Sequence, residues 1–168
     1  MIRFSFGLPN HGFRWCILVS SIRRPYTDFP LRPNTGLPGT TSQSMPVLWV
    51  RCLYQHQSLV RIQAVVDSGS PYCLFKSDIA DFLKIDLTKA PQGSLGGIIG
   101  GPSEPLYFHK INLQVENNWT FEVMGGFMKK LAWPIILGRT GFFDRFQVTF
   151  DHSMTPHEFE ITKIERPN

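Results

Sequence analysis

The stretch QAVVDSGSPYCLF, residues 63–75, carries the pattern on which the fold assignment depends. Its apolar run ends at Val66 and is broken by Asp67, Ser68 and Gly69. All three of these residues favour turns, so the plain interpretation is a turn at the end of a strand. The alternative is an aspartate that a strand end presents as the reacting group of an enzyme. The rest of the chain decides between the two.

Composition limits the classes of protein to consider. The length of 168 residues suits one domain, and 42% hydrophobic residues are enough for a packed core. Fourteen glycines and 13 prolines favour short strands and tight turns over a helical bundle. The net charge of +4 comes from scattered basic residues that form no stripe for a phosphate backbone, so we expect no nucleic-acid partner.

The cysteines and the apolar segments indicate a cytoplasmic protein. Cys16, Cys52 and Cys73 are odd in number and form no C-x-x-C pair, which argues against a disulfide scaffold and a zinc site. Three reduced thiols in a reducing compartment are expected instead. The apolar segment 13–22 is too short to span a membrane and lacks a clear signal-peptide cleavage site.

Two patterns place Asp67 at the end of a strand. Residues 26–46 are rich in Pro, Gly, Ser and Thr, so residues 1–45 are interpreted as an irregular N-terminal extension. Residues 47–54 are β-prone, a polar break follows, and residues 60–66 alternate between apolar and mostly polar side chains. This period of two predicts a β-hairpin whose second strand ends at Asp67.

The next segment, KSDIADFLK at 76–84, is the best helix signal in the chain. Ser77 can cap the N-terminus, and Ile79, Phe82 and Leu83 fall on one apolar face. The sequence therefore predicts a helix of about two turns directly after the Asp67 segment.

Further strands are expected along the second half of the chain. Alternating patterns predict strands at 110–115 and 119–123, joined by a tight turn at Asn117 and Asn118. The apolar run 131–138 predicts a buried strand, and residues 139–146 a turn or two of helix. Strands are also expected at 146–150 and near 158–164. The sum is an all-β closed or sandwiched domain with one or two short helices.

Between the helix and these strands lies the glycine-rich segment SLGGIIGGPSEP, residues 94–105. It lacks the lysine and Ser/Thr of a phosphate-binding loop. Two interpretations remain: a flexible surface loop, or a mobile hairpin that covers a cleft.

An aspartate at a strand end followed by a small hydroxyl residue and glycine suits one chemistry. Two such carboxylates held about 3 Å apart share a proton, because both cannot ionise. One carboxylate then activates a water and the other protonates the substrate carbonyl, which hydrolyses a peptide bond without a covalent intermediate.

Three segments together resemble the retropepsins, the retroviral-type aspartic proteases, and their cellular and bacterial single-domain relatives. These are VVDSG at 65–69, LGGIIGG at 95–101 and IILGRTGFFDRFQVTF at 135–150. In that order they resemble the catalytic triplet, the glycine-rich flap, and the apolar-apolar-Gly-Arg motif with its short helix and final strand. The resemblance covers 46–151 and implies a closed β-barrel with a flap hairpin; residues 152–168 form a tail with one possible extra strand.

The resemblance also implies roles for individual residues. Asp67 would be catalytic, with Ser68 and Gly69 completing the triplet. The residues near the substrate would be Ser70, Gly97, Ile98, Ile99 and Gly100. The residues that support the catalytic loop would be Ile136, Leu137, Gly138 and Arg139. No metal or organic cofactor is implied.

The sequence departs from the family pattern after the triplet. Pro71 and Tyr72 stand where viral members carry an acidic partner for the helix arginine, so Arg139 has no evident partner. The chain also holds only one Asp-[Ser/Thr]-Gly. An active site would therefore need two chains around a two-fold axis.

The sequence favours a homodimeric aspartic endopeptidase that acts on extended polypeptides. The alternative is an inactive retropepsin-like domain that serves in dimerisation or peptide binding. A Ser-His-Asp site or a histidine metal site has little support, because no nucleophile elbow or ligand spacing is present.

Overall fold

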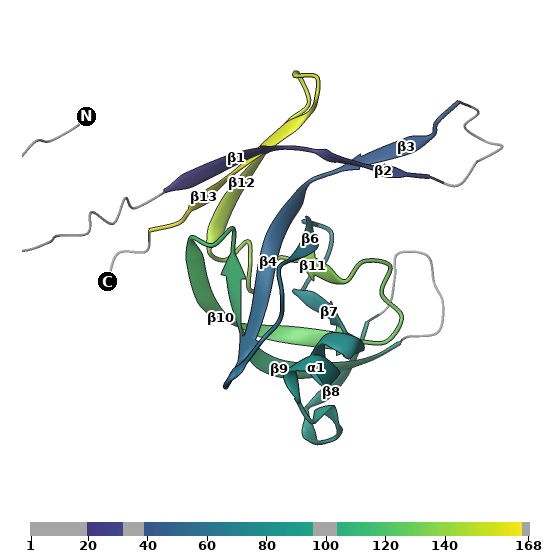
Figure 1. The fold of residues 1–168 in the computed structure, drawn as a ribbon, viewed down its shortest axis with the longest axis vertical. Coiled ribbons are helices and arrows are strands. Elements are labelled where there is room, and N and C mark those ends of the chain that lie inside the picture. The colour runs from purple at the N-terminus through teal and green to yellow at the C-terminus, as the bar shows by residue number, and fades with distance from the viewer. Residues whose placement is uncertain (1–19, 32–38, 96–103, 166–168) are drawn as a thin grey trace, which may run out of the picture.

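The computed structural model describes residues 20–31, 39–95 and 104–165 (Figure 1). The strands are β1 (Ser21–Pro25), β2 (Thr27–Pro30), β3 (Ser42–Met45), β4 (Val47–Tyr54), β5 (Gln57–Ser58), β6 (Ile62–Val66), β7 (Leu74–Lys76), β8 (Gln92–Leu95), β9 (Glu104–Val115), β10 (Trp119–Met128), β11 (Ile135–Leu137), β12 (Phe146–Asp151) and β13 (Glu158–Lys163). One α-helix, α1 (Ser77–Leu83), and one 3-10 turn, η1 (Leu87–Lys89), complete the described elements.

Six strands close into a barrel. Its sheet runs in the order β4-β6-β11-β7-β10-β9, and β4 pairs with both β6 and β9, so the last strand returns to the first. β5 and β8 extend the sheet beside β4 and β9. The expected all-β closed barrel with a short helix is confirmed, with 56% of the described residues in strands.

The core of the barrel is aromatic and aliphatic. Phe75, Phe127, Phe142, Leu48 and Leu113 are fully inaccessible to solvent. The rings of Phe75 and Phe127 stack with their centroids 5.2 Å apart. The two described cysteine thiols, of Cys52 and Cys73, lie in the same core and are free. Burial raises the pKa of Cys52 to about 12 and that of Cys73 to about 11, so both stay protonated at neutral pH.

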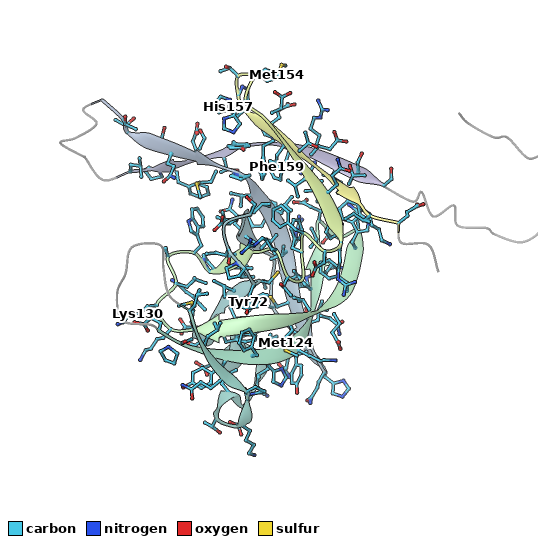
Figure 2. All side chains as sticks on the ribbon, turned by 180° about the vertical axis from the view of Figure 1, so that it is seen from behind. Tyr72, Met124, Lys130, Met154, His157 and Phe159 are labelled. Atoms are coloured by element: carbon cyan, nitrogen blue, oxygen red, sulfur yellow. The ribbon has the colours of Figure 1, made fainter. Side chains whose placement is uncertain are left out.

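A second sheet, of order β1-β13-β12, lies at the end of the barrel opposite α1 (Figure 1). The expected strands near 146–150 and 158–164 are confirmed as β12 and β13, which pair from Phe146↔Lys163 to Asp151↔Glu158. Their joining turn carries Met154 and His157 at the far tip in Figure 2. Ile22 of β1 is 8% exposed and belongs to the core cluster.

The expected irregular extension is wrong for the described residues before 46. β1 pairs with β13 over five residues, and β2 pairs with β3 as a separate hairpin. The Pro and Gly content misled the interpretation, because prolines are tolerated at the ends and edges of strands, as Pro25 and Pro30 are here. The division of the chain into domains stays a prediction.

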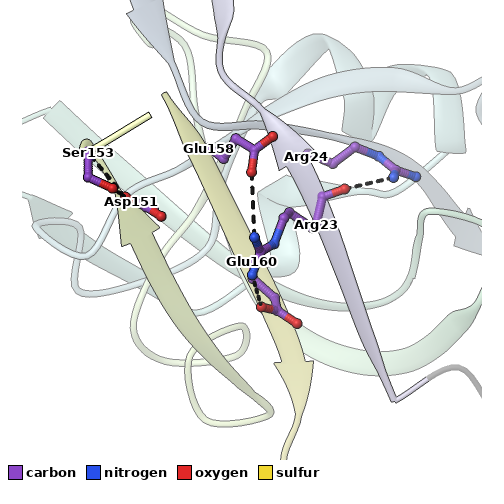
Figure 3. A network of polar contacts seen from close by, with 6 residues as sticks. All are labelled: Arg23, Arg24, Asp151, Ser153, Glu158 and Glu160. Atoms are coloured by element: carbon purple, nitrogen blue, oxygen red, sulfur yellow. Dashed lines mark hydrogen bonds and ion pairs between the residues drawn. The ribbon is translucent and has the colours of Figure 1, made fainter. Parts of the chain in front are cut away.

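Charged side chains link β1 to neighbouring strands, and Figure 3 shows the contacts of Arg23 with Glu158 and Glu160. Arg23 lies 3.1 Å from Glu160 and 3.7 Å from Glu158, but its side chain is 62% exposed, so these pairs contribute little to stability. Arg24 instead reaches Glu116, whose side chain is only 4% exposed. Glu116 also accepts the backbone N–H of Trp49, so a single buried carboxylate joins β1 to the barrel.

Several local expectations need correction. Ser77 is the first residue of α1 and not its cap; Lys76 occupies the cap position and offers no side-chain hydrogen bond. Phe82 is 52% exposed, and Ala80 takes its place on the buried face. Val60, part of the strand expected over 60–66, is 72% exposed because β6 begins only at Ile62. Propensity and period marked these elements, but tertiary packing set which residues they bury.

The connections also differ from expectation. In the segment 139–146, residues 139–145 form a compact series of turns and no helix, and Phe146 begins β12. The buried strand in 131–138 is only the three residues of β11. In the turn between β9 and β10, positive φ falls at Glu116 and Asn117 and not at Asn118. Within the described residues no helix is long and apolar enough to cross a membrane.

Candidate active site

Asp67 is positioned by the end of β6 and by its neighbour β11. The two strands run parallel, with Ile136 opposite Val65 and Leu137 opposite Val66. One step further on, the Asp67 N–H donates to the Leu137 carbonyl at 3.0 Å. The apolar residues that end β6 are buried, so the chain turns outward at the aspartate, which is the first residue only partly buried.

The turn after Asp67 fixes its carboxylate. The Gly69 N–H donates to Asp67 Oδ1 at 2.9 Å, and the Ser70 N–H donates to the Asp67 carbonyl at 3.2 Å. A carboxylate that accepts a backbone N–H has a defined orientation without a side-chain partner. Asp67 is half-buried and Ser68 and Gly69 are exposed, so a second molecule can reach the carboxylate.

Ser70 points the other way. It is 7% exposed, and its hydroxyl donates to the Tyr72 carbonyl at 2.8 Å. The structure therefore places the Ser70 side chain inside the loop, as a support for it. Contact of Ser70 with a substrate stays a prediction.

A second segment, residues 138–141, crosses under the Asp67 loop. The N–H groups of Arg139 and Thr140 donate to the carbonyls of Ser70 and Pro71, both at 2.9 Å. The Cys73 N–H returns to the Thr140 carbonyl at 3.3 Å, which completes a parallel bridge between Tyr72 and Thr140. The Asp67 loop is thus held by hydrogen bonds at its start, from Asp67 to Leu137, and at its end, from Cys73 to Thr140.

Gly138 makes this crossing possible. A Cβ built at Gly138 would lie 2.0 Å from the Tyr72 carbonyl oxygen and 2.9 Å from that of Ser70. Because both are backbone atoms, no side-chain rotation would relieve the contact. Any residue larger than glycine would push the two segments apart.

The remaining expected site residues divide into two sets. Gly97, Ile98, Ile99 and Gly100 lie outside the described residues. The strands on either side, β8 and β9, pair antiparallel up to Leu95↔Glu104. Arg139 is exposed, and no ion pair of its side chain occurs in the described part of the chain.

Sequence reasoning missed Tyr72 and Thr140, whose bridge closes the crossing. The available signal was Gly138 directly after an apolar strand, which marks a close backbone approach but not the partner. Nor did the sequence indicate the contact of Trp133 with Phe29, whose rings meet edge-on with centroids 4.6 Å apart. This contact attaches the β2–β3 hairpin to the loop before β11.

Two surface hollows lie elsewhere. One, of about 450 Å³, is lined by Trp119, Phe121, Arg145 and Lys163 among others, and a second, of about 520 Å³, by Tyr54, Phe108, His109 and Met124 among others. Neither includes Asp67. A shared site between two chains would form its cleft only on association, so we place the candidate site at Asp67 on the geometry of the loop. No cluster of three or more His, Cys, Asp or Glu side chains suited to a metal occurs among the described residues.

Comparison with known proteins points to the same fold. No family model matches the chain, and no curated protein matches its sequence. Among solved structures, the chain is similar to a retropepsin-like aspartic protease from Rickettsia conorii. The TM-score is 0.51 at 18% sequence identity, over 85% of this chain and 98% of that one. The likeness extends to the fold, and the chemistry rests on the residues described above.

Proposed function

We propose that the chain is an aspartic endopeptidase whose reacting pair consists of two copies of Asp67 in a homodimer. The observation that carries the proposal is the Asp67 loop, in which a reachable carboxylate is oriented by the Gly69 N–H and braced by residues 138–141. The fold shared with a retropepsin-like aspartic protease supports it.

The proposed mechanism follows from the paired carboxylates. The ionised Asp67 of one subunit takes a proton from a water, whose oxygen attacks the carbonyl carbon of the scissile peptide bond. The protonated Asp67 of the other subunit donates to the carbonyl oxygen. Collapse of the tetrahedral intermediate then breaks the C–N bond as the amine takes up a proton. The substrate is an extended polypeptide that pairs its backbone with strand edges around the site.

The second candidate function is a domain of the same fold without activity, used for dimerisation or peptide binding. The observation that favours it is Arg139, which has no ion-pair partner in the described part of the chain. Without such a brace the two Asp67 loops would have to be aligned by other contacts.

Substitution of Asp67 by asparagine tests the enzyme proposal. Asp67→Asn keeps the shape of the loop but removes the titrating oxygen, so cleavage of an unstructured protein between about pH 4 and 7 should fall by about 100-fold or more. Asp81→Asn, on the exposed face of α1, is the matched control and should cleave like the wild type. Equal cleavage by wild type and Asp67→Asn would show that Asp67 is not the reacting group, and no cleavage by either would leave the inactive domain as the answer.

A further inference from the structure

The β2–β3 hairpin is attached to the rest of the chain on one face only. Side chains of Thr27, Phe29 and Met45 on its inner face are half-buried, and Phe29 packs on Trp133. The other face carries Asp28 and Ser44, whose side chains bond to each other, together with the exposed Pro30 and Ser42. Within the described residues each of the two strands pairs only with the other. A two-stranded hairpin is marginal in water, so a further strand would stabilise it.

The hydrogen-bond pattern shows which edge of β3 is free. Leu31 directly follows β2 and Thr41 directly precedes β3. The Leu31 N–H donates to the Thr41 carbonyl at 2.9 Å, so these two residues form a hydrogen-bonded pair with each other. Such pairs alternate along an antiparallel ladder, which makes Phe29↔Gln43 and Thr27↔Met45 the next ones. The backbone groups of Ser42 and Ser44 therefore point away from β2.

This free edge is continuous with the edge that holds the Asp67 loop. Pro46 follows the same alternation, and its carbonyl accepts the Val66 N–H at 2.9 Å, one residue before Asp67. The edge of β3 that faces away from β2 is thus the edge on which β4 pairs with β6. In Figure 1 the hairpin projects beyond this end of the barrel, on the side away from α1.

We propose that the free edge of β3 pairs antiparallel with β3 of a second copy of this chain, which makes the hairpin a dimerisation arm. The proposal rests on the proposed function in one respect: a shared site puts the two-fold axis beside Asp67, and the free edge begins there. Two-fold symmetry requires an isologous contact, and antiparallel pairing of a strand with its own copy is the simplest one.

A second copy fits this edge better than a substrate does. Within the described strand β3, the backbone groups that face away from β2 belong to Ser42 and Ser44, a stretch too short to hold a peptide alone. Two copies of the hairpin would form a four-stranded sheet. This sheet would stabilise each hairpin for as long as the dimer exists, and it would cover the exposed edge of each β3 strand.

Replacement of Ser44 by proline tests whether the free edge of β3 pairs with a second copy. Ser44→Pro removes the outward N–H without touching the ladder to β2, since proline is tolerated at a free edge. Ser44→Ala is the matched control, because it loses the same bond to Asp28 but keeps the N–H. The dissociation constant of the full-length dimer, from sedimentation equilibrium, should rise about tenfold to 100-fold in Ser44→Pro and less than about threefold in Ser44→Ala.

The pair Ser42→Pro and Ser42→Ala repeats the test one hydrogen-bonding position further out, and circular dichroism checks that each variant is folded. Equal dissociation constants within both pairs, or a wild type that is monomeric at about 100 μM, would overturn the proposal. Unchanged dimers with a raised KM in the proline variants would assign the edge to substrate instead. Weakened dimers in a chain with no Asp67-dependent cleavage would uphold the arm while refuting the enzyme.

Discussion

At the scale of single residues, the candidate site depends on backbone contacts more than on side chains. Asp67, Ser70, Arg139 and Thr140 are joined through N–H and carbonyl groups. The hydroxyl of Ser70 and the carboxylate of Asp67 add side-chain bonds, as does Asp144, which accepts the Gly141 N–H. Such a site tolerates changes at the exposed Ser68 and Arg139 better than a change in backbone spacing.

Gly138 is where that spacing is most sensitive. We expect Gly138→Ala to lower the free energy of unfolding by about 3 kcal/mol or more, because the added methyl group would meet the Tyr72 carbonyl at 2.0 Å. Urea denaturation measures the effect. Gly69→Ala is the control: its methyl group would lie 3.1 Å from a side-chain oxygen of Asp67 and meet no backbone atom, so we expect a loss below about 1 kcal/mol. Similar losses in both variants would contradict the tight crossing.

At the scale of elements, β1 belongs to the folded unit even though the residues after it are rich in proline. It contributes Ile22 to the core, pairs along β13 and reaches Glu116 through Arg24. The second sheet is therefore built from the first and last described strands.

Truncation of Ile22 measures the contribution of β1. Ile22→Ala should lower the free energy of unfolding by about 2–4 kcal/mol, since a buried aliphatic side chain is removed. Val60→Ala, at a 72% exposed position, should change it by less than about 0.5 kcal/mol. An effect of Ile22→Ala as small as that of the control would mean that β1 is dispensable.

We expect the turn after β12 to give the second sheet a dependence on pH. The Ser153 hydroxyl and N–H donate to Asp151 at 2.6 and 2.9 Å and lower the pKa of the Asp151 carboxyl. A lowered pKa contributes stability above the unfolded value of about 4, and that stability is lost as the pH falls through the folded pKa.

Asp151→Asn should therefore be less stable than wild type at pH 7, with the difference closing as the pH falls from neutral through the folded pKa of Asp151. Urea unfolding across this range measures it, and Ser153→Ala, which removes the hydroxyl donor, should show a smaller change of the same sign. Parallel stability curves for wild type and Asp151→Asn would contradict the assignment.

At the scale of the whole molecule, the sequence was enough to predict the barrel and the place of Asp67 at a strand end. Those predictions rested on the local alternation of apolar and polar residues and on three spaced motifs, both of which can be read directly from the linear sequence. It did not predict the β1–β13 pairing, because that ladder joins Ser21 to Thr162 and leaves no local pattern. Nor did it predict the Tyr72–Thr140 bridge, which depends on two loops meeting in space.

A mixing experiment tests whether two copies of Asp67 share one site. When subunits of wild type and Asp67→Asn exchange freely, only wild-type pairs should be active, so activity at fixed total protein should follow the square of the wild-type fraction. Mixing with Asp81→Asn controls for exchange itself and should leave activity unchanged. A linear decrease with Asp67→Asn would indicate that each chain works alone.

The pairing of β1 with β13 also bears on the order in which the protein is made. During translation β1 emerges before every other described strand, while its neighbour β13 emerges after all of them. The edge of β1 that binds β13 therefore stays uncovered until the ribosome has produced nearly all of the described chain. Completion of this sheet, and of any assembly that needs it, is consequently deferred until the last described strand has emerged.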